Sequence, residues 1–186
     1  MRTPLRTAIL GGTAVAVVGA IAAVTVQASA AEQGRPVPRP SATSTPSPIE
    51  PPPGMRRIGS YRVVSGTQTY TCAKGSFVGP SVPEARLVGA GGRVHHFKGP
   101  SWQSERDGSL VTAVKVGELP RTGTIPELLL EVNSHSGPAD GVLADAAFIQ
   151  RLATSGGTAP TRACADGETV AVPYGARYVF WGPRKG

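Results

Sequence analysis

The chain has 186 residues, a formal net charge of +7, and a composition rich in glycine and proline with only two cysteines. The charge divides into +2 for residues 1–30, +2 for residues 31–57 and +3 for the remainder, which holds 13 basic and 10 acidic side chains. The part long enough to fold is therefore only mildly basic, and its lysines and arginines are scattered singly. This scatter argues against nucleic acid as a partner, because nucleic-acid binders gather their basic residues into a patch or stripe.

Residues 1–30 have the three parts of a secretory signal peptide in the right order. Arg2 and Arg6 make the start positive, residues 8–26 are uncharged and mostly apolar, and residues 28–30 read Ala-Ser-Ala, a small-x-small cleavage site. An uncleaved membrane anchor is the alternative, because the apolar run approaches the roughly 20 residues that span a bilayer. Alanine, glycine and threonine dominate the run, which favours cleavage. We expect a secreted, extracellular or envelope-associated protein that meets the membrane only transiently.

Residues 31–57 are predicted to be a disordered, Pro-rich linker. Eight prolines lie between Glu32 and Arg57, mixed with serine, threonine and arginine, and large apolar residues are almost absent. Such a segment cannot bury enough apolar surface to offset the entropy lost on ordering. It could hold a domain away from a wall or membrane, and an unselected tether is the alternative interpretation.

Residues 58–186 match the usual size of a single domain. Short apolar stretches separated by Gly, Pro, Asn, Asp and Ser predict an all-β sandwich or barrel. The clearest strand covers residues 67–73, where Gln68, Tyr70 and Cys72 alternate with three threonines. Further strands are predicted over residues 85–90, 93–97, 110–116, 127–132, 169–172 and 177–181, with a turn or bulge at 173–175.

Two stretches carry special patterns. Leucines at 128, 129 and 130 are consecutive, so their strand should be buried on both faces or lie at a layer boundary. Residues 142–154 fit either one short helix ending at Gly156 or, in their second half, a strand. We favour the strand.

Cys72 and Cys164 are expected to form a disulfide. They are an even pair in a chain predicted to be exported, the setting in which disulfides form and persist. A reactive thiol or a pair of metal ligands is the alternative, although no CxxC spacing or Cys/His cluster is present. We expect no metal site and no cofactor.

The densest group of polar side chains lies between Val94 and Ser109, in what the pattern predicts to be mostly loop. It contains His96, Trp102 and Asp107, and simple packing around turns is the main alternative to a binding role. His96 with Asp107 and a nearby serine could be assembled into a hydrolase triad, but no nucleophile motif supports one. The adjacent histidines at 95 and 96 should point to opposite faces of a strand, which disfavours a shared metal.

Nicotinamide chemistry is rejected. Residues 89–92 read Gly-Ala-Gly-Gly, but Val94 stands where the G-x-G-x-x-G fingerprint needs its last glycine, and no βαβ alternation surrounds it. Gln68 shares a strand face with Tyr70 and Cys72, and if that face is the inner one its amide needs partners. A core glutamine with its hydrogen bonds satisfied is favoured over a ligand contact, and Gln150 poses the same question.

These segments resemble a family of exported bacterial and fungal proteins, the domain of unknown function numbered thirty-four fifty-five. The resemblance runs from about Gly66 to Trp181 and rests on a set of short motifs. They are Gly66–Cys72, His96–Trp102, Asp107–Ser109, Ile125–Leu130, Ile149–Leu152, Gly156–Pro160, Cys164 and Val172–Tyr174.

The family implies a β-rich fold, export and a paired Cys72 and Cys164, and it implies no activity. Some fungal members carry the label malate dehydrogenase, which nothing in this sequence supports. Glu127 stands where the family pattern usually has tryptophan. The motif positions that could do more than pack are Gln68, His96, Trp102, Asp107 and Gln150.

The sequence thus favours a non-enzymatic extracellular β domain that binds a small molecule, a cell-wall glycan or a surface protein. An extracellular enzyme using His96 with Asp107 is the second hypothesis, and a structural surface component is the third. The enzyme hypothesis requires both side chains to meet in one concave pocket.

Overall fold

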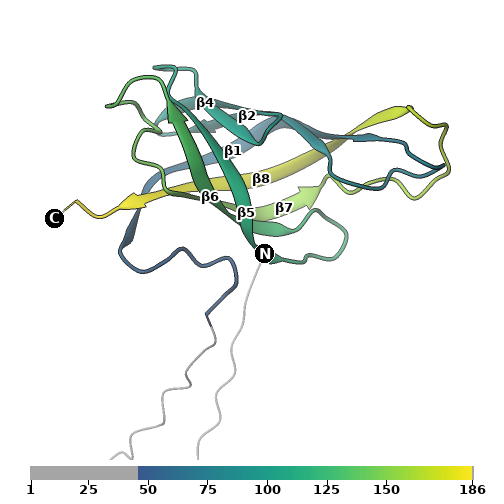
Figure 1. Ribbon diagram of the computed structural model, residues 1–186, viewed down its shortest axis with the longest axis horizontal. Coiled ribbons are helices and arrows are strands. Elements are labelled where there is room, and N and C mark those ends of the chain that lie inside the picture. Colours follow the sequence, from purple (N-terminus) through teal and green to yellow (C-terminus); the bar gives the residue numbers. More distant parts are fainter. Residues whose placement is uncertain (1–45, 186) are drawn as a thin grey trace, which may run out of the picture. The chain divides into compact units, whose positions relative to one another are not determined.

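The computed structural model describes residues 46–185, which form a closed antiparallel barrel (Figure 1). Each strand pairs with the next along the chain, and the last strand pairs with the first, so the barrel has no free sheet edge. The strands are β1 (Met55–Thr71), β2 (Val82–Gly89), β3 (Gly92–Phe97), β4 (Ser101–Ser104), β5 (Leu110–Leu119), β6 (Glu127–Ser136), β7 (Phe148–Gly156) and β8 (Thr169–Pro183).

The all-β prediction is confirmed, and of its two architectures the barrel is the one formed. The described residues contain no helix, so none there could cross a membrane. The predicted signal peptide and residues 31–45 of the predicted linker lie outside the described residues.

Most strands fall where the alternation places them, and the differences occur beside turn residues. Residues 148–156 form β7, so the second half of the ambiguous stretch is a strand, as favoured. The strand β4 was expected to be loop, because its four residues sit between Gly99 and a second turn at residues 105–108. The two expected final strands are one, β8, whose pairing with β1 shifts register between Thr67 and Arg62, opposite the predicted bulge at 173–175.

Part of the predicted linker belongs to the fold. Strand β1 begins at Met55, and Ile49 is buried although the chain around it is exposed. The boundary predicted at residue 57 is therefore too late. The high proline content made this part of the domain look like a linker. Proline has no backbone N–H donor, which suits a segment that crosses the outside of a sheet without pairing to it.

The segment 46–54 crosses the outer face of the barrel over one row of residues. Gly117, Leu129, Gln150 and Val179 are neighbours in register on β5, β6, β7 and β8. The Gln150 amide nitrogen donates to the Ile49 carbonyl at 2.6 Å. Leu129 is therefore buried from outside while its neighbours Leu128 and Leu130 face the barrel core, which confirms that this strand is buried on both faces.

The barrel interior is a hydrophobic core closed at one end. At that end the 105–109 turn meets the 138–146 connection, where Leu143 is buried and its amide donates to the Ser109 hydroxyl at 3.2 Å. The Tyr61 ring also lies there, against Gly91 and edge-on to Phe180. The two connections and the Tyr61 ring therefore cover the barrel interior at this end.

At the other end β1 and β8 continue beyond the barrel into a small disulfide lobe, residues 70–79 and 157–172. Figure 1 shows the two arms of this lobe extending together to one side of the barrel. Cys72 and Cys164 form a disulfide there, as predicted, beside a second cluster that includes Tyr70 and Phe77. Because the bridge joins residues 92 apart, its loop-closure effect on the unfolded chain is about 4–5 kcal/mol at most.

Gly117 should be required for the segment 46–54 to seat on the barrel. A Cβ at this position would clash with the Pro48 carbonyl oxygen, and no side-chain movement could relieve the clash because that oxygen belongs to the backbone. We expect Gly117→Ala to lower the free energy of unfolding by about 1–3 kcal/mol, the usual cost of overpacking, and to speed proteolytic cleavage between residues 46 and 54. Urea denaturation and limited proteolysis measure both.

The matched control is Val116→Ala, because that neighbouring side chain is 51% exposed and contacts little. An unchanged cleavage rate in Gly117→Ala would contradict the close seating of the segment.

Candidate functional site

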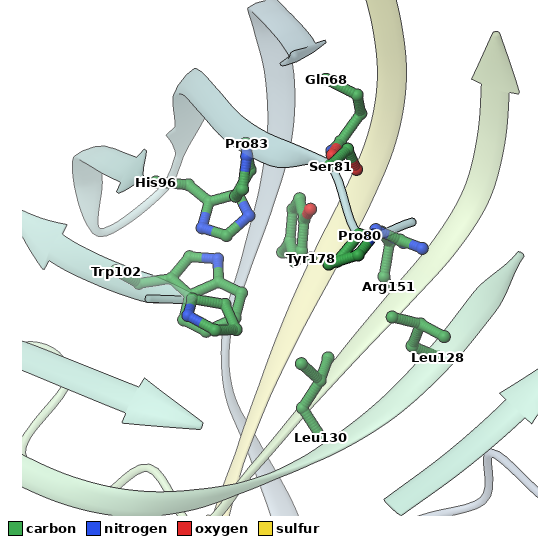
Figure 2. A pocket seen from close by; sticks show the side chains of 11 residues that line it. Gln68, Pro80, Ser81, Pro83, His96, Trp102, Leu128, Leu130, Arg151 and Tyr178 are labelled. Carbon is green, nitrogen blue, oxygen red and sulfur yellow. Dashed lines mark hydrogen bonds between the residues drawn. The ribbon is translucent and has the colours of Figure 1, made fainter. Parts of the chain in front are cut away.

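A cavity of about 220 Å³ lies at the open end of the barrel, beside the disulfide lobe (Figure 2). Its walls come from β1, β2, β3, β4, β6, β7 and β8, from the chain between the lobe and β2, and from the turn between β3 and β4. Much of the lining is apolar, with polar groups concentrated in a few side chains. The lining residues are Gln68, Pro80, Ser81, Pro83, His96, Pro100, Trp102, Leu128, Leu130, Arg151 and Tyr178.

His96 and Trp102 form one wall as a stacked pair. They face each other across the β3–β4 pairing, with ring centroids 4.3 Å apart and planes within 6°. The His96 Nδ1–H donates to the Ser101 carbonyl oxygen at 2.9 Å, because a carbonyl can only accept. In the neutral ring Nε2 then carries the free lone pair. His95 points outward and bonds Glu84, so the predicted opposite facing of the two histidines is confirmed.

The His96 ring is held neutral. Burial lowers the pKa of His96 from its ordinary value near 6.5 to about 3, because the apolar surroundings disfavour the charged imidazolium. The side chain is 2% exposed. At neutral pH the ring offers the cavity an acceptor and no charge.

Two buried N–H donors belong to side chains of the cavity wall. Gln68 Oε1 accepts a hydrogen bond from the Ser81 hydroxyl at 2.5 Å, but Gln68 Nε2 has no partner among residues 46–185. Trp102 Nε1 has none there either. A buried donor without an acceptor costs about 1–3 kcal/mol. Four buried side-chain atoms in the described residues are unpartnered, and two of them line this cavity.

Arg151 supplies positive charge to the same wall. Its Nε and Nη2 donate to the Pro126 carbonyl oxygen at 3.1 and 2.9 Å, which fixes the guanidinium while leaving other N–H groups available. No carboxylate of the described residues lies within ion-pair distance of Arg151. Arg151 lies two residues after Ile149, a core residue, and therefore shares the inward face of β7 with it. This spacing is visible in the sequence and could have indicated that the Arg151 side chain faces inward.

Tyr178 completes the interior wall and was also missed. Its hydroxyl lies 3.2 Å from the Tyr174 hydroxyl, and its ring contacts both His96 and Trp102. Burial raises the pKa of both tyrosines, so both phenols remain protonated. The alternation of Ala176, Tyr178 and Phe180 on β8 could have placed it inside.

Asp107 is not brought to His96. It lies in the turn at the closed end, where Oδ1 accepts from the Ser109 amide at 3.0 Å and hydroxyl at 2.7 Å, and Oδ2 accepts from the Val142 amide at 2.8 Å. Hydrogen bonds from Ser109 and then Val142 hold the pKa of Asp107 well below its usual range. The carboxylate therefore joins two connections of the closed end, whereas His96 faces the cavity at the open end.

Gln150 and Glu127 also lie outside the cavity. Gln150 Oε1 accepts from Trp181 Nε1 at 2.8 Å, and its nitrogen holds Ile49, so its amide is satisfied on the outer face. Glu127 Oε1 accepts from the Ala153 amide at 2.8 Å, at a residue with φ of 49°. The Glu127 carboxylate thus holds a strained turn of β7.

Of the five sequence-predicted binding positions, the cavity collects Gln68, His96 and Trp102. Within residues 46–185 no group of three His, Cys, Asp or Glu side chains converges as a metal would need.

The fold and site define a class: a small disulfide-bonded, closed antiparallel β-barrel with an internal cavity at one end. The chain belongs to DUF3455, a family described as protein of unknown function, whose sequence pattern matches residues 82–182. The matched range holds His96, Trp102, Arg151 and Tyr178, while Gln68 precedes it. No curated protein and no solved structure matches the chain.

His96 should stay neutral across the physiological range. Because burial places its folded pKa near 3, the ring nitrogens should show no titration between pH 8 and 5, with the proton on Nδ1. Nitrogen-detected NMR of the imidazole rings measures this, with His96→Asn identifying the resonance. A titration of this ring midway near pH 6.5 would contradict the buried environment.

The lowered pKa of His96 fixes the direction in which pH changes stability through this residue. Below about pH 6.5 the unfolded chain takes up the His96 proton and the folded chain does not, so this residue lowers stability as pH falls toward 3.

Asp107 should stabilise the fold at neutral pH and lose that effect in acid. Its folded pKa lies below the unfolded value near 3.8, so its contribution is complete above about pH 5 and declines as pH falls below about 4. We expect Asp107→Asn to be less stable than the wild type at pH 7, because the amide nitrogen of asparagine only donates and cannot replace a carboxylate oxygen that accepts from Ser109 or Val142. The gap should shrink at pH 3. Chemical denaturation at several pH values measures the gap.

Asp140→Asn is the matched control, since Asp140 is exposed in a nearby turn. A gap independent of pH would contradict the ionised, hydrogen-bonded state of Asp107.

Proposed function

We propose that this protein is an exported, non-enzymatic binding module that holds one small organic molecule in the cavity at the open end of its barrel. The observation that carries the proposal is the pair of buried donors, Gln68 Nε2 and Trp102 Nε1, left without acceptors beside a cavity. A ligand acceptor would satisfy groups that the fold itself leaves unpaired. Eight-stranded barrels are wide enough inside to hold one small ligand.

The dimensions favour a small molecule over the glycan and protein alternatives. A volume of about 220 Å³ equals roughly seven waters, at about 30 Å³ of liquid volume each. An extended glycan or a protein surface would need a longer groove or a broad exposed patch. The large apolar residues that are most exposed, such as Val78 and Val116, do not line the cavity.

Catalysis is the less supported alternative. A general base works best with a pKa near the operating pH, and His96, with a pKa of about 3, would hold a proton too weakly at neutral pH. Its partner at Nδ1 is the Ser101 carbonyl, and Asp107 is engaged at the closed end. A neutral, fixed imidazole suits a hydrogen-bond acceptor in a binding site.

The compartment is proposed on two grounds. The disulfide is compatible with an extracellular location, and the signal-peptide pattern of residues 1–30 predicts export. The Pro-rich residues before the barrel would then separate the binding domain from the cell envelope.

A fragment screen tests the proposal directly. The exported chain is screened by ligand-observed NMR against neutral and charged compounds of about 8–15 non-hydrogen atoms. We expect binders that shift the Trp102 indole N–H resonance and weaken at least tenfold in Gln68→Leu. The same variant should change the free energy of unfolding by no more than about 1.5 kcal/mol, because leucine removes an unpaired buried donor together with one hydrogen bond from Ser81.

Gln103→Leu is the matched control, since it makes the same substitution on an exposed position of β4. Binders that are indifferent to Gln68→Leu, or a screen with none, would overturn the proposal.

A further inference from the structure

The charge balance of the cavity points to the chemical class of its ligand. No Asp or Glu lines it, and His96 contributes no charge, so Arg151 is the single ionised side chain in its wall. A lone cation in a partly apolar wall favours an anionic partner. Its charge is not used by an ion pair of the described residues.

The nearby carboxylates are engaged elsewhere. Glu127 accepts from the Ala153 amide and lies 3.8 Å from the Arg121 guanidinium, so it is already paired. Glu84 bonds His95 on the outer face, with its side chain 61% exposed. Arg151 is thus held by a neutral carbonyl, which positions the guanidinium without cancelling its charge.

The hydrogen-bond donors of the cavity wall also favour an anionic ligand. Gln68 Nε2 and Trp102 Nε1 are donors without partners in the described residues, and the guanidinium carries donors only. A carboxylate presents two oxygens with about four acceptor positions, and arginine matches that planar geometry better than lysine does. Figure 2 shows Arg151 and Gln68 around the same opening as His96 and Trp102.

The rest of the wall selects the body of the ligand. Pro80, Pro83, Pro100, Leu128 and Leu130 provide apolar surface, and the aromatic stack fixes one side. The volume of about 220 Å³, roughly that of seven waters at about 30 Å³ each, suits a ligand with a small body. A polar chain such as a sugar acid would leave its hydroxyls unpaired against these residues.

We infer that the ligand is a small monocarboxylate with a compact apolar ring, its carboxylate bound by Arg151 and its ring enclosed by the prolines and leucines. The inference rests on the proposed function of the cavity and names the ligand class. The neutral Nε2 of His96 is left to accept a hydrogen bond from a ring hydroxyl where the ligand has one.

Benzoate and its neutral isostere benzamide test the inference. Titrations followed by amide NMR should give a benzoate dissociation constant of about 10 μM to 1 mM, typical for so few atoms. Benzamide should bind at least tenfold more weakly. Arg151→Met should reduce the ratio of the two dissociation constants to about one. Arg151→Lys should leave an intermediate ratio, because lysine keeps the charge but lacks the planar pair of donors that matches a carboxylate.

Arg121→Met is the matched control, since it removes the same charge from an exposed site outside the cavity and should preserve the ratio. The benzoate-to-benzamide ratio of the wild type needs no variant, so the test survives if an Arg151 variant fails to fold.

The outcomes separate the two proposals. If benzamide binds as tightly as benzoate, or Arg121→Met removes the preference as well as Arg151→Met does, the carboxylate inference is wrong while the cavity remains a binding site. If neither probe nor any fragment of the screen binds, both proposals fail.

Discussion

The pairing of β1 with β8 is the constraint on which the rest of the structure depends. These are the two longest strands, 17 and 15 residues, and together they close the sheet and continue past it. Closure removes the exposed strand edges that would otherwise offer unpaired N–H and C=O groups to other chains. The same two strands place Gln68 and Tyr178 at the cavity, and their continuation brings Cys72 near Cys164, so the disulfide secures the pairing that shapes the site.

The two ends of the barrel differ in how their polar groups are treated. At the closed end Asp107 satisfies Ser109 and Val142 and joins two loops, which is a stabilising arrangement. At the open end Gln68 and Trp102, two residues that line the cavity, keep buried donors without partners in the described residues. The Tyr61 hydroxyl at the closed end is also buried without a partner there, but Tyr61 does not line the cavity. Buried polar groups are usually hydrogen-bonded, so two unpartnered donors on residues of one cavity wall need an explanation. This contrast supports a binding role at the open end.

The strands were largely predictable from sequence, and so were some members of the site. Alternation placed Gln68 and Tyr70 on one face of a strand, which the structure shows to be buried, and adjacent residues 95 and 96 on opposite faces. The short strand β4 was missed, because four residues between two turns carry too little periodicity. Arg151 was missed as a site residue because a charged side chain in a strand usually faces solvent, and only the register with Leu128 shows it inside.

The predicted linker boundary is another feature that the local sequence could not place correctly. Consecutive leucines at 128–130 indicated burial on both faces of a strand, which in a single-layer barrel requires something outside it. The cover is the segment around Ile49, whose composition reads as disordered when taken alone. Local composition measures what a segment can bury by itself, and Ile49 is buried by contacts with residues about a hundred positions away.

The sequence alone determined the β class, the family resemblance, the cysteine pair and the export pattern, because these depend on local alternation and on composition. Only the tertiary structure decided that the sheet closes into a barrel, that His96 and Asp107 lie at opposite ends, and that Arg151 joins Gln68, His96 and Trp102 in one cavity. The physical reason is register. A shift of one residue between two strands exchanges inside for outside, and register across a barrel is set by pairings between residues far apart in the chain.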